Sequence, residues 1–229
     1  MKSLFKSFFF NRFTAKYFLK STLFLHSFLY KFLTKLAIIH NNGFHPKHKI
    51  IKYEEWFLNN IYEGWVILDI GSNTGFLSQK LAKKASYIYG IDIDEIHIKK
   101  AISLNLSNNV SYICADATSY DYDGIKIDCI VMSNVLEHIE YRTKFLTSII
   151  SKDIWKTKPR FLIRVPMIER DWVVKYKQSL GLDYRLDTTH YIEYTFDEFL
   201  EELKEANISI ISHTIRFGEI YAVCEGNLK

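Results

Sequence analysis

Short apolar runs alternate with helical patterns along most of this chain, and this alternation restricts its fold more than any other feature. Seven apolar runs have the length of strands, at residues 65–70, 87–93, 110–114, 127–132, 160–165, 208–216 and 220–224. Helical spacing of apolar residues occurs at 53–61, 76–84, 95–106, 137–150 and 196–206. Alternating strands and helices form mostly parallel sheets that helices cover on both faces. We therefore expect a three-layer α/β sandwich with a mostly parallel seven-stranded sheet and an antiparallel edge hairpin.

Charge is spread unevenly between the start of the chain and the rest. Residues 1–53 hold ten Lys or Arg and no acid, since the first acid is Glu54. The remaining residues carry twenty bases and all 26 acids. A basic, acid-free segment joined to a mildly acidic body indicates an extension that meets an anionic partner. We expect a basic, aromatic, helical extension over residues 1–52 and a globular domain over residues 53–229.

The extension is rich in aromatic residues, and several interpretations of it stay open. It could be a helical cap packed on the domain, with its lysines pointing outward. It could instead hold residues 1–40 on an anionic membrane surface, or be a nucleic-acid arm or a transit peptide. The longest run without Lys or Arg between Lys2 and Lys35 is residues 21–30, whereas a spanning helix needs about 20 mostly apolar residues. We therefore expect no transmembrane helix, and no secretory signal because no small-residue cleavage site follows that run.

A glycine-containing loop follows the first predicted strand and opens a helix. It reads Asp69-Ile-Gly71-Ser-Asn73-Thr-Gly75. Glycines let the backbone turn tightly and approach a ligand closely, and the amides at a helix N-terminus favour a negatively charged group. Asn73 can adopt a left-handed conformation and so replace a glycine at modest cost. Taken alone, the loop is also compatible with a plain strand-to-helix turn.

Two further acids follow the next two strands. Asp92 ends the second strand, 21 residues after Gly71, where an acid accepts hydrogen bonds from the ribose hydroxyls of an adenosine ligand. Asp116 follows the third strand, where a carboxylate can accept a hydrogen bond from an exocyclic amine. Each acid alone is explained equally well as a helix N-cap or a loop residue. Together with Asp69 they predict a nucleoside site at the carboxyl edge of the sheet.

Two adenosine-containing ligands compete for this site, a nicotinamide dinucleotide and S-adenosylmethionine. A dinucleotide loop needs a third glycine, in the pattern G-x-G-x-x-G, but the third position here is the bulky Phe76. Asp69 brings nothing to a diphosphate, whereas it can attract the ammonium group of a methionine moiety. The residues therefore favour S-adenosylmethionine as the cofactor.

Five segments resemble motifs of the class I S-adenosylmethionine-dependent methyltransferases. VILDIGSNTGFLSQKLA resembles their first motif, YIYGIDID their second-strand motif and CADA their adenine-side motif. DCIVMSNVLEHI is similar to the fourth-strand segment of the LEH-type branch (methyltransferase-11/23-like), and HYIEYTFDEFLEELKEANI resembles a later region of that branch. The resemblance covers roughly residues 53–224, and it implies a Rossmann-like fold and methyl transfer.

The resemblance assigns cofactor contacts to eleven residues at the ends of the first four strands: Asp69, Gly71, Ser72, Asn73, Gly75, Asp92, Ile93, Asp116, Ala117, Ser133 and Asn134. The loop would hold the methionine part, with Asp69 on its ammonium group. Asp92 and Ile93 would bind the ribose and adenine. Asp116 and Ala117 would contact the adenine amine and ring. Ser133 and Asn134 would line the floor of the site beside the reacting methyl. Asn73 stands where a glycine is usual, which leaves the path of the loop open.

Methyl transfer is an in-line displacement, for which the enzyme aligns the acceptor about 3 Å from the methyl carbon and excludes water. An oxygen acceptor would also gain from a general base, and the candidates are Glu137, His138, Asp187 and His190. Each has a structural alternative. Glu137 can be a first-turn acid of the following helix, and either histidine can be a packing or hydrogen-bonding residue.

We expect no metal site. Some RNA 3′-end methyltransferases of this fold bind a divalent ion through E-x-x-E-H and a distant histidine, but Asn134 takes the place of the first acid here. The pair His45 and His48 is separated by Pro46, which predicts a turn rather than two ligands on one helix face.

The leading hypothesis is a methyltransferase that acts on a small-molecule or glycan acceptor, at oxygen. Residues 166–194 are aromatic and charged, and they would form a substrate cover that suits a sugar ring. One alternative is RNA methylation, although nucleic acid is not the expected partner. Another is a non-catalytic module associated with membranes. The three cysteines form no CxxC pair, which favours a reducing cytoplasm, with peripheral membrane attachment through the extension as an option.

Overall fold

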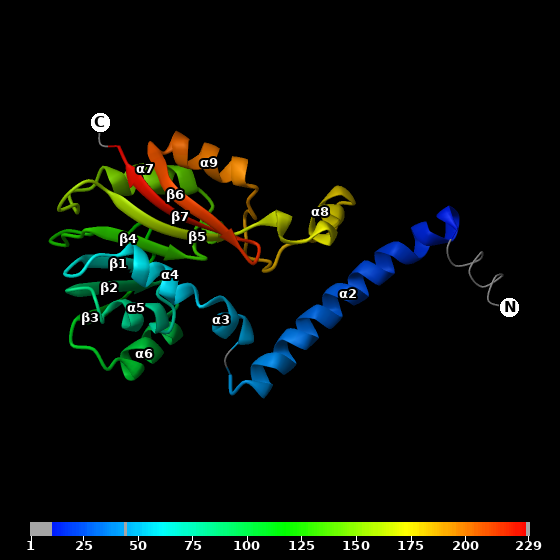
Figure 1. Ribbon diagram of the computed structural model, residues 1–229, viewed down its shortest axis with the longest axis horizontal. Coiled ribbons are helices and arrows are strands. Elements are labelled where there is room, and N and C mark those ends of the chain that lie inside the picture. Colours follow the sequence, from blue (N-terminus) through cyan, green and yellow to red (C-terminus); the bar gives the residue numbers. More distant parts are fainter. Residues whose placement is uncertain (1–10, 44, 228–229) are drawn as a thin grey trace. The chain divides into compact units, whose positions relative to one another are not determined.

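The protein folds as two compact units, the first ending at Lys52 and the second beginning at Tyr53. The computed structural model describes residues 11–43 and 45–227 (Figure 1). In the first unit the described helices are α2 (Arg12–His40) and α3 (Pro46–Ile51). The second unit contains the sheet and the remaining described helices.

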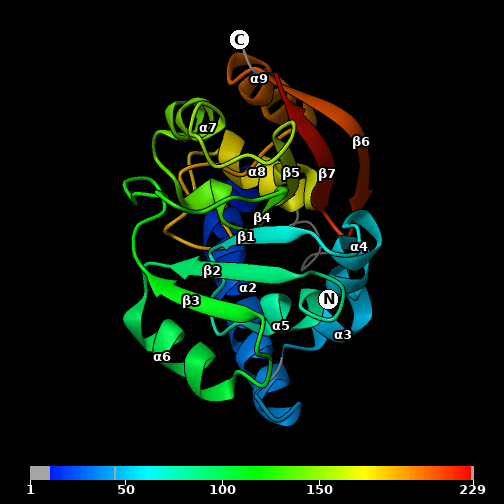
Figure 2. The same cartoon turned by 90° about the vertical axis from the view of Figure 1, so that its left-hand side faces the viewer.

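The second unit is built on a seven-stranded sheet with the order β3-β2-β1-β4-β5-β7-β6 (Figure 2). Its strands are β1 (Val66–Ile70), β2 (Tyr87–Asp92), β3 (Val110–Cys114), β4 (Cys129–Ser133), β5 (Arg160–Pro166), β6 (Ile208–Arg216) and β7 (Glu219–Gly226). The first five pair in parallel, and β7 pairs antiparallel with both β5 and β6. This confirms the predicted fold class, including the edge hairpin.

Helices pack on the sheet in two groups (Figure 1). The α-helices are α4 (Tyr53–Asn60), α5 (Phe76–Leu81), α6 (Glu95–Leu104), α7 (Arg142–Ile150), α8 (Trp172–Ser179) and α9 (Phe196–Glu205), and the short 3-10 helices are η1 (Leu136–His138) and η2 (Ile168–Arg170). In one group α4 contacts α5, and α5 and α6 contact β2. In the other, α7 contacts α9, which lies against β6.

The central strands are mostly apolar because helices cover both of their faces; Asp69 on β1 and Arg164 on β5 are exceptions. Ile130 and Met132 on β4 are fully buried, as are Leu162 and Ile163 on β5. On the outer strand β6 most side chains are exposed or half-buried. This contrast is typical of a doubly covered sheet with one open edge.

A buried ion pair joins β5 to β7 beside the core. Arg164 donates from Nε to Glu219 Oε2 at 3.0 Å and from Nη2 to Oε1 at 3.2 Å. The Tyr221 hydroxyl donates to the same carboxylate at 2.9 Å. The guanidinium also lies 4.3 Å from the centre of the Tyr53 ring, so it connects α4 to the sheet. The charges are therefore satisfied, as buried charges must be.

The helix predicted over residues 137–150 is wrong at its start. Residues Leu136–His138 form the separate 3-10 helix η1, and α7 begins only at Arg142. The Glu137 carbonyl accepts a hydrogen bond from the Tyr191 N–H at 2.8 Å, and Ile139 is extended. Glu137 therefore lies outside α7 and is not one of its first-turn acids.

Two helices were not predicted. Helix α8 begins after Asp171, whose side chain accepts from the Val173 N–H at 3.0 Å as an N-cap. Helix α3 begins at Pro46, where a turn was expected. Proline is well suited to the first position of a helix because its missing N–H would have no partner there, and the side chain of His45 caps the helix by accepting from the Lys47 N–H.

Helix α2 corrects the expectation about membrane spanning. Its segment Tyr17–His40 is long and apolar enough to cross a membrane by length and composition, with a mean hydropathy of 1.3. No spanning helix was expected from the sequence because its runs without Lys or Arg are short. That criterion was too strict, because a lysine near a helix end can extend its ammonium group to the interface. Signal sequences and buried core helices share these properties, so α2 meets a necessary condition only.

Candidate functional site

The predicted cofactor residues gather where the order of the strands reverses, between β1 and β4. From β1 the sheet continues to β2 and β3 on one side, and to β4 and β5 on the other. Open α/β sheets bind ligands in the crevice at the carboxyl ends of the strands at such a point. Loop 71–75 follows β1 at this edge, and Asn134 directly follows β4.

Loop 71–75 passes through three left-handed residues, with φ of 70° at Gly71, 49° at Asn73 and 78° at Gly75. Two of them are also too close to other side chains to carry a Cβ. A Cβ on Gly71 would lie 2.3 Å from Val135 Cγ2, and one on Gly75 would lie 2.2 Å from the Tyr112 hydroxyl. Asn73 adopts the left-handed conformation that its replacement of a glycine requires.

Asp92 anchors this loop from the end of β2. Its Oδ2 accepts a hydrogen bond from the Asn73 N–H at 2.8 Å, and its Oδ1 accepts one from the Asp94 N–H at 2.9 Å. The Gly71 N–H donates to the Ile91 carbonyl at 2.8 Å. A carboxylate offers about four acceptor positions, so Asp92 retains capacity for ligand hydroxyls.

Asp69 lies inside β1 behind the loop and is 1% exposed. The Ser78 hydroxyl donates to its Oδ2 at 2.6 Å. Burial raises the pKa of Asp69 to about 7, the Ser78 hydrogen bond lowers it, and the negative charge of Asp92 raises it further. Ser78 was not singled out from the sequence, since a serine in a helix carries no signal of a partner nine residues earlier.

Two buried oxygens at this edge have no hydrogen-bond partner in the described part of the chain. They are Ser72 Oγ in the loop and Asn134 Oδ1 after β4. Asn134 is held in a left-handed conformation with φ of 56°, and its N–H donates to the Arg164 carbonyl at 2.8 Å. Buried polar atoms without partners are costly. The site therefore offers polar atoms on both sides of the reversal point to a ligand.

The other predicted cofactor residues lie at neighbouring strand ends. Ile93 follows Asp92 and is 72% exposed. Asp116 is exposed and accepts from the Thr118 N–H and hydroxyl through Oδ1, while Ala117 is half-buried. Ser133 differs, because its hydroxyl already accepts from Arg164 Nη1 at 3.2 Å.

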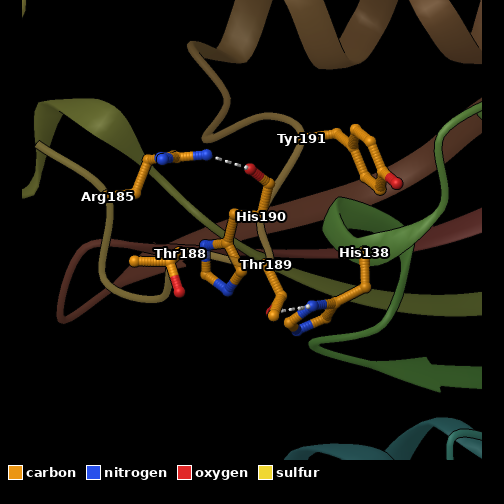
Figure 3. A pocket seen from close by; sticks show the side chains of 6 residues that line it. All are labelled: His138, Arg185, Thr188, Thr189, His190 and Tyr191. Carbon is orange, nitrogen blue, oxygen red and sulfur yellow. Dashed lines mark hydrogen bonds between the residues drawn. The ribbon is translucent and has the colours of Figure 1, made fainter. Parts of the chain in front are cut away.

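The three candidate catalytic residues, Glu137, His138 and His190, come together although they lie on two separate segments. One donor atom from each lies within 4.8 Å of the other two. The two imidazole rings meet edge to face, with their centres 4.6 Å apart. Helix η1 carries Glu137 and His138, and the segment between α8 and α9 carries His190. Figure 3 shows the two histidines.

Glu137 is fully buried, and neither carboxylate oxygen has a hydrogen-bond partner from another described residue. Burial raises the pKa of Glu137 to about 8, and Arg164 opposes that shift. The Arg164 guanidinium is committed to Glu219 and Ser133. Glu137 is thus a buried acid whose oxygens are free to bind a further group.

Both histidines are oriented by side chains that sequence reasoning did not assign. His138 Nδ1 lies 2.9 Å from the Thr189 hydroxyl, which donates to Asp187 Oδ1 at 2.9 Å. His190 Nδ1 lies 3.2 Å from Oε1 of the buried Glu193. Burial and the nearby His190 lower the pKa of His138, although Asp187 opposes the shift.

Glu193 is held in turn by Arg170 Nη1 and by the Leu186 N–H. These contacts have a structural reason, because the buried carboxylate of Glu193 needs hydrogen-bond donors. The one sequence signal for it was its position three residues after His190.

A pocket of about 360 Å³ opens beside this cluster. Its lining consists of His138, Arg185, Thr188, Thr189, His190 and Tyr191 (Figure 3). Arg185 donates from Nη1 to the His190 carbonyl at 3.1 Å, which helps to fix the segment. The predicted substrate cover over residues 166–194 therefore contributes most of the residues that line this pocket.

Known proteins share the fold of the second unit, and one family matches part of it. The fold is shared with magnesium protoporphyrin IX methyltransferase from Synechocystis PCC 6803, solved with bound SAH. The two are 19% identical with a TM-score of 0.58, over 79% of this chain and 83% of that chain. Residues 68–150, from β1 to α7, match the family described as Methyltransferase domain. The chain thus matches this family over residues 68–150, and its second unit has the fold of class I S-adenosylmethionine-dependent methyltransferases.

Curated relatives match the chain over short lengths. The mitochondrial ubiquinone biosynthesis O-methyltransferase of Arabidopsis thaliana is 27% identical over 92 residues, which is 38% of this chain and 29% of the relative. The ubiquinone/menaquinone biosynthesis C-methyltransferase UbiE of Blochmanniella pennsylvanica is 30% identical over 109 residues, which is 44% of this chain and 43% of the relative. The chain thus spans less than half the length of these relatives.

Proposed function

We propose that this methyltransferase domain transfers the methyl group of S-adenosylmethionine to an oxygen of a small-molecule or glycan acceptor. S-adenosylmethionine is the cofactor of this family, and solved neighbours hold it or SAH. The main support for the proposal is the left-handed loop 71–75 at the reversal point, with Asp92 directly beside it.

The residues present fit this cofactor. Asp92 retains acceptor positions for the ribose hydroxyls, and the exposed Ile93 offers an apolar face to the adenine. Asp116 Oδ1 is used by Thr118, so its other oxygen would meet the adenine amine, with Ala117 beside the ring.

The methionine part would lie along loop 71–75, where the unpartnered Ser72 hydroxyl provides a polar contact. Asp69 is buried behind the loop, so we assign its contact with the ammonium group to a bridging water. The Asn134 side chain, with Ser133 beside it, would lie near the reacting methyl.

The first prediction tests the cofactor by calorimetric titration of the purified protein with S-adenosylmethionine. We expect micromolar binding, and at least a tenfold loss in Asp92→Ala, because each hydrogen bond to a charged group contributes about 1.5–3 kcal/mol. Asp94→Ala is the matched control, since it removes the next acid of the same loop, and it should retain most of the affinity. NADH should not bind.

Equal affinity in Asp92→Ala and wild type would contradict the assignment of Asp92. Absence of binding in a folded wild-type protein would contradict the methyltransferase proposal. In that case a non-catalytic role for the fold would become the better explanation.

The acceptor would occupy the pocket beside His138 and His190. A hydroxyl acceptor loses its proton as its oxygen attacks the methyl carbon, and a positioned group that receives the proton speeds this step. His138 is held by Thr189 and Asp187 in a chain of hydrogen bonds that keeps its ring oriented. The charged and aromatic lining, Arg185 and Tyr191, suits a polar ring. An acceptor screen in which C–H acceptors gave turnover and hydroxyl acceptors gave none would overturn the oxygen assignment.

We also propose that residues 1–40 attach the enzyme to an anionic membrane surface on the cytoplasmic side. Helix α2 exposes large apolar side chains along its length: Phe13, Tyr17, Phe18, Phe24, Leu25, Phe28, Leu29, Tyr30, Phe32, Leu33, Leu36 and Ile39. No acid accompanies them before Glu54. The three cysteines are free, in agreement with a reducing compartment.

A second prediction concerns this attachment. The full chain should sediment with vesicles that contain anionic phospholipid and less with zwitterionic vesicles, because basic residues add about 1 kcal/mol each near an anionic surface. The double variant Phe24→Ser/Phe28→Ser should be largely released. Tyr62→Ser, an aromatic of similar exposure in the second unit, should behave as wild type. High salt should release a helix bound at the surface, whereas a spanning helix would stay in the pellet. Equal sedimentation of the double variant and wild type would refute the attachment.

A further inference from the structure

The geometry points to a divalent transition-metal site formed by Glu137, His138 and His190. One donor atom from each residue lies within 4.8 Å of the other two. Two imidazoles and one carboxylate are a ligand set that zinc and iron(II) accept, and that leaves further positions open. This inference replaces the expectation, based on the missing acid at Asn134, that the chain binds no metal.

The first support is the state of Glu137. Its side chain is fully buried, and its two oxygens have no hydrogen-bond partner from another described residue. Its nearby cation, Arg164, is already bound to Glu219 through two hydrogen bonds. A buried polar group without a partner is costly, and a bound cation would remove that cost.

The second support is the way in which both histidines are held. His138 uses Nδ1 for the Thr189 hydroxyl, and His190 uses Nδ1 for the buried Glu193. Each ring therefore keeps Nε2 for a metal. Histidine ligands in proteins regularly engage their second nitrogen with a carboxylate or another polar group, which fixes the ring and its tautomer.

The third support is that these outer partners are themselves fixed. The Thr189 hydroxyl donates to Asp187 at 2.9 Å, and Glu193 is bound by Arg170 and the Leu186 N–H. The Tyr191 N–H donates to the Glu137 carbonyl, so the two segments that carry the ligands are joined by their backbones. The outer partners of both histidines are thus held by hydrogen bonds of their own.

The position beside the pocket gives the metal a role that rests on the proposed function. A cation held by these three protein ligands would have coordination positions left for an acceptor from the adjoining 360 Å³ pocket, which His138 and His190 line. With a metal bound, His138 Nε2 would be a ligand and would not receive the proton of the acceptor. An acceptor hydroxyl at the open position would instead lose its proton to solvent more readily, because the cation stabilises the oxyanion. The oxygen electron pair then forms the bond to the methyl carbon, and the C–S bond breaks with its electron pair remaining on sulfur.

The test is titration of the chelator-treated full chain with Co²⁺, followed by the visible absorption that Co²⁺ shows when bound to protein nitrogen and oxygen. We expect one equivalent to bind, Zn²⁺ to displace it and Mg²⁺ to leave it in place. Glu137→Gln and His190→Gln should each weaken Co²⁺ binding at least tenfold. Thr189→Val, which releases His138 Nδ1, should weaken it about 10- to 100-fold, as changes to the partners of metal ligands do.

His213→Ala is the matched control, because it removes an exposed histidine of β6 that lies outside the cluster. It should bind Co²⁺ as wild type does. If Glu137→Gln does not fold, His138→Gln carries the same test from an exposed side chain. No Co²⁺ spectrum from folded wild type, or an equal loss in His213→Ala, would overturn the site.

Binding of S-adenosylmethionine to the same samples separates the two proposals. Co²⁺ binding without cofactor binding would leave the metal site standing and remove the methyltransferase proposal. Cofactor binding without Co²⁺ binding would remove the metal site and leave the methyltransferase proposal standing.

Discussion

Replacing Gly71 by alanine should abolish measurable binding of S-adenosylmethionine and lower the free energy of unfolding by about 2–5 kcal/mol. Left-handed backbone costs a residue with a Cβ about 1–2 kcal/mol, and the backbone here has φ of 70°. The added Cβ would also lie 2.3 Å from Val135 Cγ2, and forcing extra atoms into a packed region costs about 1–3 kcal/mol more. Relief of this clash moves the loop away from the position that Asp92 holds, so the cofactor site is lost with it.

Gly124→Ala separates the two causes. Gly124 has φ of 75°, but a Cβ there meets nothing within 4 Å. The free energy of unfolding of this variant should therefore fall only by the cost of the left-handed backbone, about 1–2 kcal/mol. The variant should bind the cofactor as wild type does. Urea unfolding and calorimetric titration measure both quantities. A Gly71→Ala protein that matched Gly124→Ala in both would show that contact with Val135 does not shape the site.

The strands could be predicted from the sequence because the sheet is covered on both faces. A strand such as β4 is then apolar at nearly every position, and the resulting run stands out between polar loops. Boundaries moved by one or two residues only. The hairpin was visible as well, because two strand-like runs flank Gly218, which has φ of 72°.

Helix limits were harder to predict where a distant residue decides them. The apolar pattern after Glu137 continues without interruption into α7, but the Glu137 carbonyl is taken by the N–H of Tyr191, 54 residues later in the sequence. Helix α8 was missed because its polar and apolar residues carry little periodic signal, and its start depends on the Asp171 side chain.

The candidate site shows the same division. Strand ends are local features, so the acids at the carboxyl edge could be placed from the sequence. The convergence of Glu137 with His190 depends on how a long segment after β5 folds back, and no local pattern records that. The burial of Asp69 against Ser78 could not be predicted from the sequence either, although burial is the main cause of the raised pKa of Asp69.

Asp69→Asn should stabilise the protein above neutral pH by up to about 4 kcal/mol. In the folded protein, burial raises the pKa of Asp69 from 3.8 to about 7. Between these two pH values the folded state keeps a proton that the unfolded chain has released. Stability therefore falls as the pH rises from about 4 to about 7, and it stays lower above that range. A difference of three pKa units corresponds to about 4 kcal/mol.

The asparagine variant removes this slope while it keeps the hydrogen bond, because the Ser78 hydroxyl can donate to the amide oxygen. In urea unfolding at pH 5 and pH 8, the free energy of unfolding of the variant should exceed that of wild type by more at pH 8 than at pH 5. Asp123→Asn, an exposed acid in a loop, is the control and should follow wild type at both. Equal pH slopes in wild type and Asp69→Asn would contradict the raised pKa. Asp69→Asn should also bind S-adenosylmethionine more weakly, since a neutral amide cannot balance an ammonium group. A buried carboxylate retained at such a cost is the trade between stability and activity that active sites show.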